Sequence, residues 1–138
     1  MVQIVKIAHI TIVEDNPADV LLVRKALQER GIAFELTCFD DGEEALKSLS
    51  RQERDEPDII LLDLNLPKTE GVEVLRRIRS IPKLVNVPIA ILSSSVSPTD
   101  MHRIKLLGVA RYISKPTALD DFLREVGRAV EEMLLEGQ

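Results

Sequence analysis

Asp63 is the residue whose position most clearly suggests chemistry. It ends the run Asp58-Ile59-Ile60-Leu61-Leu62-Asp63, whose apolar character predicts a strand buried on both faces of a parallel sheet. Pro67 follows and stops the strand from continuing. Open α/β folds bind ligands at the carboxyl ends of their strands, so we expect Asp63 to present its carboxylate there. Taken alone, Asp63 could equally be an acid that caps the turn after the strand.

Polar side chains also end three of the other expected strands. Glu14-Asp15 follows the first, Ser93 ends the fourth and Lys115 follows the fifth. Because the carboxyl ends of parallel strands share one edge, these side chains should converge with Asp63. Each has a simpler interpretation: the acid pair could favour the next helix through its dipole, Ser93 could belong to a turn, and Lys115 could be a solvated surface lysine. Their coincidence at one edge favours a site.

The chemistry of this set points to phosphoryl transfer. Three crowded carboxylates raise one another's pKa values unless a cation joins them, and Mg²⁺ is a hard cation that binds carboxylates together with phosphate oxygens. A lysine can neutralise phosphoryl oxygens, and a serine hydroxyl can donate a hydrogen bond to one of them. A carboxylate can itself be the nucleophile that forms an aspartyl-phosphate. We therefore expect a magnesium-dependent site centred on Asp63.

The elements that must position these residues alternate between strand and helix. Strands are expected at residues 7–13, 33–39, 58–63, 88–93 and 110–114. Helix starts are marked by Asn16-Pro17, Asp41-Gly42, Gly71, Ser97-Pro98 and Thr117. Such a pattern predicts an α/β fold with a doubly wound, five-stranded parallel sheet covered by helices on both faces. One domain is expected over residues 1–138, with its core at about residues 7–134.

The bulk properties exclude several classes of protein. With 45% hydrophobic and 30% charged residues, the chain has the composition of a globular domain. Its formal net charge of -5 argues against binding to nucleic acid, and its apolar runs are too short to span a membrane. The amino terminus lacks the pattern of a signal peptide. The single cysteine, Cys38, rules out an internal disulfide and favours a cytoplasmic location.

Four sequence segments together resemble the receiver domain of two-component response regulators. They are Val13-Glu14-Asp15-Asn16, Leu62-Asp63-Leu64-Asn65-Leu66-Pro67 followed by Gly71, Ile91-Leu92-Ser93-Ser94, and Tyr112-Ile113-Ser114-Lys115-Pro116. The resemblance extends from about residue 7 to residue 134. It implies the flavodoxin-like strand order 2-1-3-4-5. It also implies a phosphoacceptor that assists its own phosphorylation and dephosphorylation, rather than an enzyme with an external substrate.

The resemblance assigns a role to each matching residue. Asp63 would accept a phosphoryl group from the phosphohistidine of a histidine kinase or a phosphotransfer protein. Mg²⁺ would be bound by Asp63, directly by Asp15, mainly through a water by Glu14, and by the backbone carbonyl of Asn65. Ser93 and Lys115 would bind the phosphoryl group. Tyr112 would turn inward when Ser93 moves, and the Lys115-Pro116 bond is a candidate cis peptide.

The resemblance also implies how the signal leaves the domain. Output would occur by contact with a downstream protein, through the face formed by the fourth helix, fifth strand and fifth helix, which could also form a homodimer. At the end of the fifth helix, Met133-Leu134-Leu135 could continue the core or contribute to that dimer. Asn16-Pro17-Ala18-Asp19 and the segment from Asp63 to Lys68 are similar to the small regulators paired with bacterial phytochromes. The kinase, its stimulus, the target, the oligomeric state and the phosphoryl lifetime are not readable from the sequence.

Three alternatives remain beside this hypothesis. An aspartyl-nucleophile phosphatase commonly needs a second acid two residues after the nucleophile, and Asn65 occupies that place. A dinucleotide-binding domain would carry a Gly-x-Gly-x-x-Gly phosphate cradle after the first strand, which this chain lacks. A receiver fold could also act as a constitutive interaction module without phosphorylation, although the complete acidic set argues against that.

Overall fold

A computed structural model describes residues 6–53, 55–115 and 118–137 of the chain. Strands and helices alternate along it, as the sequence predicts. The strands are β1 (Ala8–Val13), β2 (Phe34–Phe39), β3 (Ile59–Asp63), β4 (Ile89–Ser93) and β5 (Arg111–Ser114). The helices are α1 (Pro17–Glu29), α2 (Gly42–Leu49), α3 (Gly71–Arg79), α4 (Pro98–Leu106) and α5 (Leu119–Glu136), with a short 3-10 helix η1 (Pro82–Leu84).

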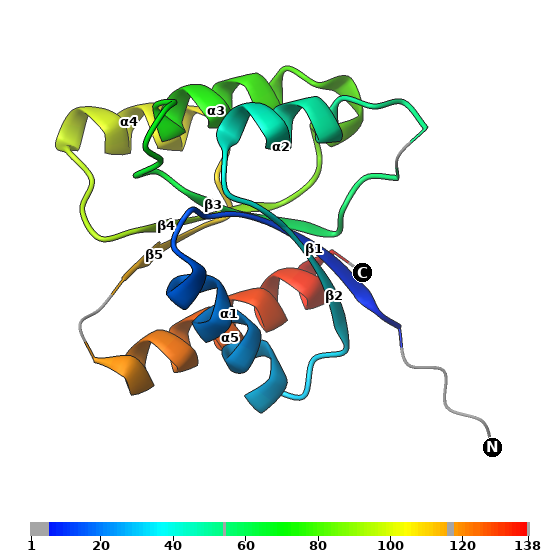
Figure 1. Ribbon diagram of the computed structural model, residues 1–138, viewed down its shortest axis with the longest axis vertical. Coiled ribbons are helices and arrows are strands. Elements are labelled where there is room, and N and C mark those ends of the chain that lie inside the picture. Colours follow the sequence, from blue (N-terminus) through cyan, green and yellow to red (C-terminus); the bar gives the residue numbers. More distant parts are fainter. Residues whose placement is uncertain (1–5, 54, 116–117, 138) are drawn as a thin grey trace.

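The five strands form one parallel sheet in the order β2-β1-β3-β4-β5, which confirms the expected flavodoxin-like topology. Helices α1 and α5 cover one face of the sheet, and α2, α3 and α4 cover the other (Figure 1). The central strands β3 and β4 are buried at every position, because helices lie over both of their faces. Asp63 therefore ends a strand whose direction is set by packing on both sides.

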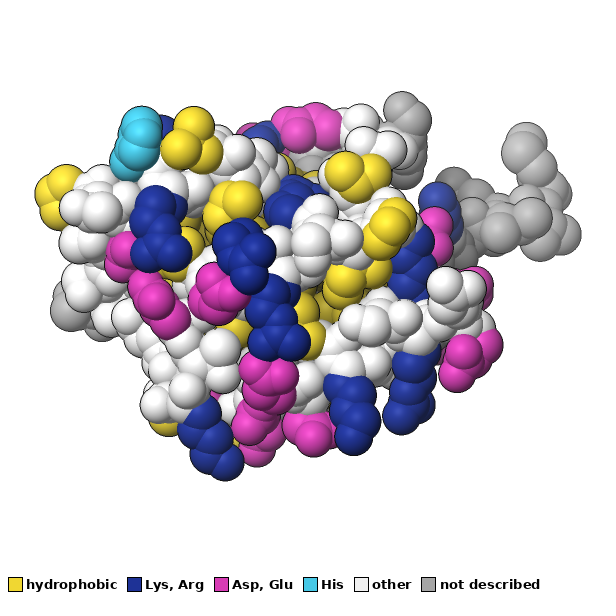
Figure 2. Space-filling view, turned by 90° about the horizontal axis from the view of Figure 1, so that it is seen from above, with side chains coloured by type: hydrophobic (Ala, Val, Ile, Leu, Met, Phe, Trp, Pro, Cys, Tyr) yellow, Lys and Arg dark blue, Asp and Glu magenta, His cyan; other side chains and the backbone are white. Residues whose placement is uncertain are grey.

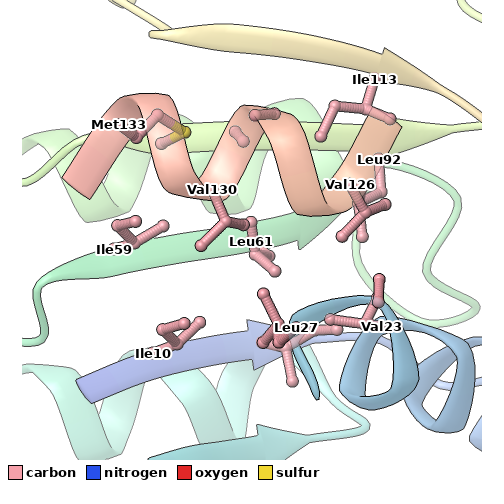
Figure 3. Packing of buried hydrophobic residues seen from close by; sticks show 14 of the residues in the cluster. Ile10, Val23, Leu27, Ile59, Leu61, Leu92, Ile113, Val126, Val130 and Met133 are labelled. Carbon is pink, nitrogen blue, oxygen red and sulfur yellow. The ribbon is translucent and has the colours of Figure 1, made fainter. Parts of the chain in front are cut away.

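Two hydrophobic clusters hold the helical layers against the sheet. In the cluster beneath α1 and α5, Val23 and Leu27 of α1 face Ile10 and Leu61 of the sheet (Figure 3). Val126, Val130 and Met133 of α5 complete this cluster, so Met133 belongs to the core, whereas Leu135 is exposed. The opposite cluster joins α2, α3 and α4 to the other face of the sheet. Alternation along each strand supplies both clusters, since successive side chains point to opposite faces.

Helix α4 is held by fewer apolar contacts than the other long helices. Ile104 is its one fully buried residue among those described. Polar contacts compensate: Arg103 pairs with Glu70 at the start of α3, at 3.2 Å. The Arg79 guanidinium of α3 donates to five backbone carbonyls around the end of α4 and the start of β4, those of Leu84, Val85, Val87, Leu107 and Gly108. Arg79 therefore joins the connection between α4 and β5 to the segment before β4.

The surface over α2, α3 and α4 carries basic and acidic side chains side by side (Figure 2). Arg77 of α3 pairs with Glu43 of α2 at 2.6 Å, and Arg76 pairs with Glu73 one turn away. On this face the basic and acidic side chains are mixed and do not gather into a basic patch (Figure 2). Within the described part of the chain, no helix is both long and apolar enough to cross a membrane.

The ends of the elements follow the sequence signals closely, with two differences. Asn16 and Ser97 accept hydrogen bonds from the first turns of α1 and α4, and Gly31 and Gly108 adopt positive φ after those helices. The expected strand starts are each one residue early. Helix α5 begins at Leu119 with Ala118 as its N-cap, which makes no side-chain capping bond; Thr117, expected to start this helix, lies outside the described residues.

Candidate functional site

The carboxyl ends of the central strands bring the expected site residues together at one edge of the sheet. β1 leads directly into Glu14 and Asp15, β3 ends at Asp63, β4 ends at Ser93, and Lys115 follows β5. The register places Asp63 beside Leu92, and Ser93 beside Ser114. The parallel order thus gathers residues that are up to 101 positions apart in the chain.

The acidic cluster consists of Glu14, Asp15 and Asp63. One carboxylate oxygen from each lies within 4.8 Å of the others. Glu14 and Asp63 are only 3% and 2% exposed, whereas Asp15 is exposed. Two buried carboxylates with a third beside them form an oxygen-rich, negatively charged site that is open to solvent on the side of Asp15. Such a donor set suits a hard divalent cation.

Lys115 lies at the centre of the acidic groups. Its Nζ donates to Glu14 Oε1 at 2.6 Å and to Asp19 Oδ2 at 3.0 Å. The distance from Nζ to Asp63 Oδ2 is longer, at 3.5 Å. Because the Lys115 side chain is 15% exposed, these charges attract one another more strongly than a surface pair would. The lysine thus partly neutralises the buried acids of the metal-free protein.

The charges of the site shift the pKa values of two of its groups. Burial, together with the hydrogen bond to Asp63, raises the pKa of Glu14 to about 8, although Lys115 opposes the shift. Burial alone would lower the pKa of Lys115, but the carboxylates of Glu14 and Asp19 outweigh it and raise that pKa above its ordinary value. The negative charge of Glu14 is therefore less stable than that of an exposed glutamate, because the carboxyl is buried and lies beside Asp63.

Asn65 and Ser93 form a polar network beside Asp63. The Asn65 backbone N–H donates to Asp63 Oδ1 at 2.9 Å, which fixes that carboxylate. Its side-chain amide donates to Ser93 Oγ at 3.0 Å and to Ser94 Oγ at 3.3 Å. The Ser93 hydroxyl donates to the carbonyl of Ser95 at 2.8 Å. Ser93 is thus fully buried and held by the loop that follows β4.

A close backbone approach shapes the loop between Asp63 and α3. A Cβ added at Gly71 would lie 2.4 Å from Leu64 Cα and 2.5 Å from Leu64 O. Only glycine allows the start of α3 to touch the backbone between Asp63 and Asn65. The glycine after the Leu62–Pro67 segment is therefore needed to place this loop.

Tyr112 and the residues after β5 complete the expected set. Tyr112 is half-buried and packs against the cluster that joins α2, α3 and α4 to the sheet, so it is not a fully exposed aromatic. The expected cis peptide between Lys115 and Pro116 involves Pro116, which lies outside the described residues.

Two features of the site were not expected from the sequence. Asp19, in the first turn of α1, contributes a fourth carboxylate through its contact with Lys115. The only sequence signal for it is its place one helical turn after the Glu14-Asp15 pair. The bonds of the Asn65 side chain to Ser93 and Ser94 were also missed, because they depend on how two loops approach each other.

Comparisons with known proteins agree with this geometry. The model of the response regulator receiver domain family matches residues 10–127, and the chain belongs to this family. Response regulator Rcp1 from Synechocystis sp. is 37% identical over 131 residues, which cover 92% of this chain and 88% of Rcp1. The structure of the phosphorylated cyanobacterial phytochrome response regulator RcpA covers 96% of this chain and 97% of RcpA, at 36% identity and a TM-score of 0.85.

Structures of relatives with bound metal bear on the acidic cluster. The Mn²⁺-bound form of Rcp1 matches with a TM-score of 0.83 at 35% identity, covering 92% of this chain and 94% of that one. The receiver domain of the sensor histidine kinase PA1611 from Pseudomonas aeruginosa PAO1, with magnesium in its active-site cleft, matches at 28% identity and a TM-score of 0.69, covering 91% and 99%. Together with the donor set of Glu14, Asp15 and Asp63, they indicate a site suited to divalent metal.

Proposed function

We propose that this receiver domain accepts a phosphoryl group on Asp63, in a Mg²⁺-dependent reaction with a phosphorylated histidine kinase or phosphotransfer protein. The observation that supports this most strongly is that Asp63 belongs to the acidic cluster and lies 3.5 Å from the Lys115 ammonium. A nucleophilic carboxylate, a metal-binding set and a cation for phosphoryl oxygens are the parts that such a transfer needs.

The transfer is an exchange of one bond for another. The phosphorus–nitrogen bond of the phosphohistidine breaks as a bond forms between phosphorus and one Asp63 carboxylate oxygen. The electron pair of the broken bond stays on the imidazole, which takes up a proton. No oxidant or further reactant is needed, and loss of the group to water regenerates the carboxylate.

The residues around Asp63 would divide the work between metal and phosphoryl binding. Asp15, Glu14, Asp63 and the backbone carbonyl of Asn65 would hold Mg²⁺, which when bound neutralises charge on the transferring group. Lys115 would bind a phosphoryl oxygen with the side of its ammonium that already faces Asp63. The Ser93 hydroxyl would have to leave the Ser95 carbonyl to donate to a second oxygen.

This change at Ser93 would carry the signal to the surface. Ser93 is the last residue of β4, and Tyr112 of β5 lies beside Ile91 of β4 in the sheet register. Movement of Ser93 toward the phosphoryl group would open space for the half-buried Tyr112 to turn inward. The altered face of α4, β5 and α5 would then bind a downstream protein or a second copy of the chain. The domain is thus a phosphorylation-controlled switch rather than an enzyme.

The kinase partner that we propose is a phytochrome-type sensor. Support comes from the likeness to RcpA, whose structure is that of a cyanobacterial phytochrome response regulator, over nearly the full length of both chains. Transfer from a panel of phosphorylated histidine kinases tests this directly. Preferred transfer from a kinase unrelated to phytochromes would contradict the proposed partner and leave Asp63 as acceptor.

Incubation with Mg²⁺ and acetyl phosphate, followed by intact mass measurement, tests the main proposal. We expect the protein to gain one phosphoryl group, the Asp63→Asn variant to gain none, and EDTA to prevent the gain. Asp40→Asn is a matched control, because Asp40 follows β2 at the same edge of the sheet but lies outside the acidic cluster.

Three outcomes would contradict the proposal. Absence of an adduct with every donor would favour a constitutive interaction module on the same fold. An adduct that persists in Asp63→Asn would place the acceptor elsewhere. Sustained turnover of unrelated phosphate esters would favour a phosphatase.

A further inference from the structure

Asp19 is a fourth carboxylate at the site, and neither the metal set nor the phosphoryl set uses it. It occupies the third position of α1, after the Asn16 cap and Pro17, and its side chain is 22% exposed. Its Oδ2 accepts a hydrogen bond from Lys115 Nζ at 3.0 Å, across 96 positions of sequence. An acid in the first turn favours a helix through its dipole, but that role does not require a lysine partner.

The Lys115 ammonium has three N–H donors, and two of them are engaged in hydrogen bonds to carboxylates. Glu14 accepts at 2.6 Å and Asp19 at 3.0 Å, while Asp63 lies farther away at 3.5 Å. Asp19 is thus a closer partner of the lysine than the proposed phosphoacceptor is. A phosphoryl group on Asp63 must therefore compete with Asp19 and Glu14 for the Lys115 ammonium.

We propose that Asp19 is a positioning residue that holds Lys115 toward α1 in the unphosphorylated protein and competes with the phosphoryl group for its ammonium. The inference rests on the proposed phosphorylation of Asp63. Glu14 keeps Lys115 within the site when Asp19 is neutralised, because it makes the shorter of the two hydrogen bonds. Neutral Asp19 therefore releases the lysine toward Asp63 without displacing it from the site. Asp19 sets how readily the domain becomes phosphorylated.

The chain contains a close structural match for use as a control. Asp100 occupies the third position of α4, after the Ser97 cap and Pro98, as Asp19 does in α1. Its carboxylate faces Arg103 at 3.4 Å instead of a residue of the acidic site. Asp100→Asn removes the same charge from the same helix position, so it reproduces the effect on a helix dipole without touching Lys115.

The first experiment measures the lysine itself in the metal-free protein. The ¹⁵N-labelled Lys115 ammonium, assigned with a Lys115→Arg variant, reports its exchange with water by NMR. We expect Asp19→Asn to accelerate this exchange about fivefold, the effect of losing one partly screened ion pair. Asp100→Asn should leave it unchanged, and Asp19→Glu should restore slow exchange because it keeps a carboxylate within reach of a flexible lysine.

The second experiment measures phosphorylation by acetyl phosphate and Mg²⁺ in the same variants. The ratio of phosphorylated to unphosphorylated protein at steady state should rise about fivefold in Asp19→Asn and remain at the wild-type value in Asp100→Asn. If Lys115 exchanges with water at the wild-type rate in Asp19→Asn, the proposal is overturned. Increased phosphorylation with that rate unchanged would also overturn it, because Asp19 would then oppose phosphorylation only by repulsion between negative charges. Faster exchange without any change in steady-state phosphorylation would overturn the competition.

The two experiments also separate this inference from the proposed function. If the wild-type protein takes no phosphoryl group from any donor, the proposed function fails. The exchange of Lys115 in Asp19→Asn still decides whether Asp19 holds the lysine.

Discussion

The contact between Gly71 and the loop after Asp63 allows a quantitative test of how the site is built. Replacement of Gly71 by alanine would put a Cβ 2.4 Å from Leu64 Cα, whereas carbon atoms in ordinary contact are about 3.5–4.0 Å apart. Backbone must therefore move by about 1 Å, since no flexible side chain can yield. Overpacking of this kind costs about 1–3 kcal/mol, and we expect Gly71→Ala to lower the free energy of unfolding by about 2 kcal/mol.

The expected loss corresponds to a melting temperature lower by about 7 °C, for an unfolding entropy of about 0.3 kcal/mol/K in a chain of this length. Thermal and urea unfolding in EDTA measure it, and titration with Mg²⁺ should also show weaker binding, because Asn65 moves with Leu64. Gly137→Ala is the control. The added Cβ would lie 3.5 Å from its nearest atom, Met133 O, so the free energy of unfolding should change by less than about 0.5 kcal/mol. Equal stability of Gly71→Ala and wild type would refute the argument, and so would equal losses in both variants.

Burial raises the pKa of Glu14 to about 8, so between its unfolded value of 4.5 and 8 the folded metal-free protein keeps a proton that the unfolded chain has released. Stability in EDTA should therefore fall as the pH rises through this window, by up to about 1.4 kcal/mol per unit, and a flat profile, or an unchanged one in Glu14→Gln, would contradict this. Mg²⁺ affinity measured by calorimetry should rise over the same window, since the metal binds the carboxylate. Arg79→Met should lower the free energy of unfolding by about 2–3 kcal/mol, because five backbone carbonyls lose a charged donor. Its control is Arg76→Met, which removes an exposed pair with Glu73 and should cost less than about 1 kcal/mol. Equal losses of stability in the two variants would refute the role of Arg79. Leu61→Ala should cost about 2–5 kcal/mol in urea unfolding by opening a cavity beneath α5, and a loss below about 1 kcal/mol would show that the core collapses around it.

Much of the fold was readable from local signals. The apolar run that ends in Asp63 predicted a central strand, and β3 is buried at all five positions. The Asn16 and Ser97 caps marked helix starts because their side chains bond to the first turn that follows them. The fifth helix is observed as expected, from Leu119 to Glu136, but Thr117, predicted to start it, lies outside the described residues, and Ala118 caps it without a side-chain bond.

For the candidate site, the sequence predicted which residues lie at the strand ends but not which of them contact one another. Glu14, Asp15, Asp63, Ser93 and Lys115 were expected at one edge, because parallel strands all end there. Which of them touch was not predictable. A long side chain such as that of Lys115 can reach several acids, and which of them it binds depends on their exact positions in the folded protein.

The sequence by itself determined the alternation of strands and helices and the residue types that end each strand, since these depend on local periodicity and turn residues. The order of the strands in the sheet was implied by the resemblance to receiver domains, not by these local signals. Only the tertiary structure decided that Glu14 is buried and its pKa raised, that Arg79 fixes the end of α4, and that Lys115 lies closer to Asp19 than to Asp63. These features join residues from separate elements. They arise from the way α1, α3 and the loops pack around the sheet, which no local pattern in the sequence records.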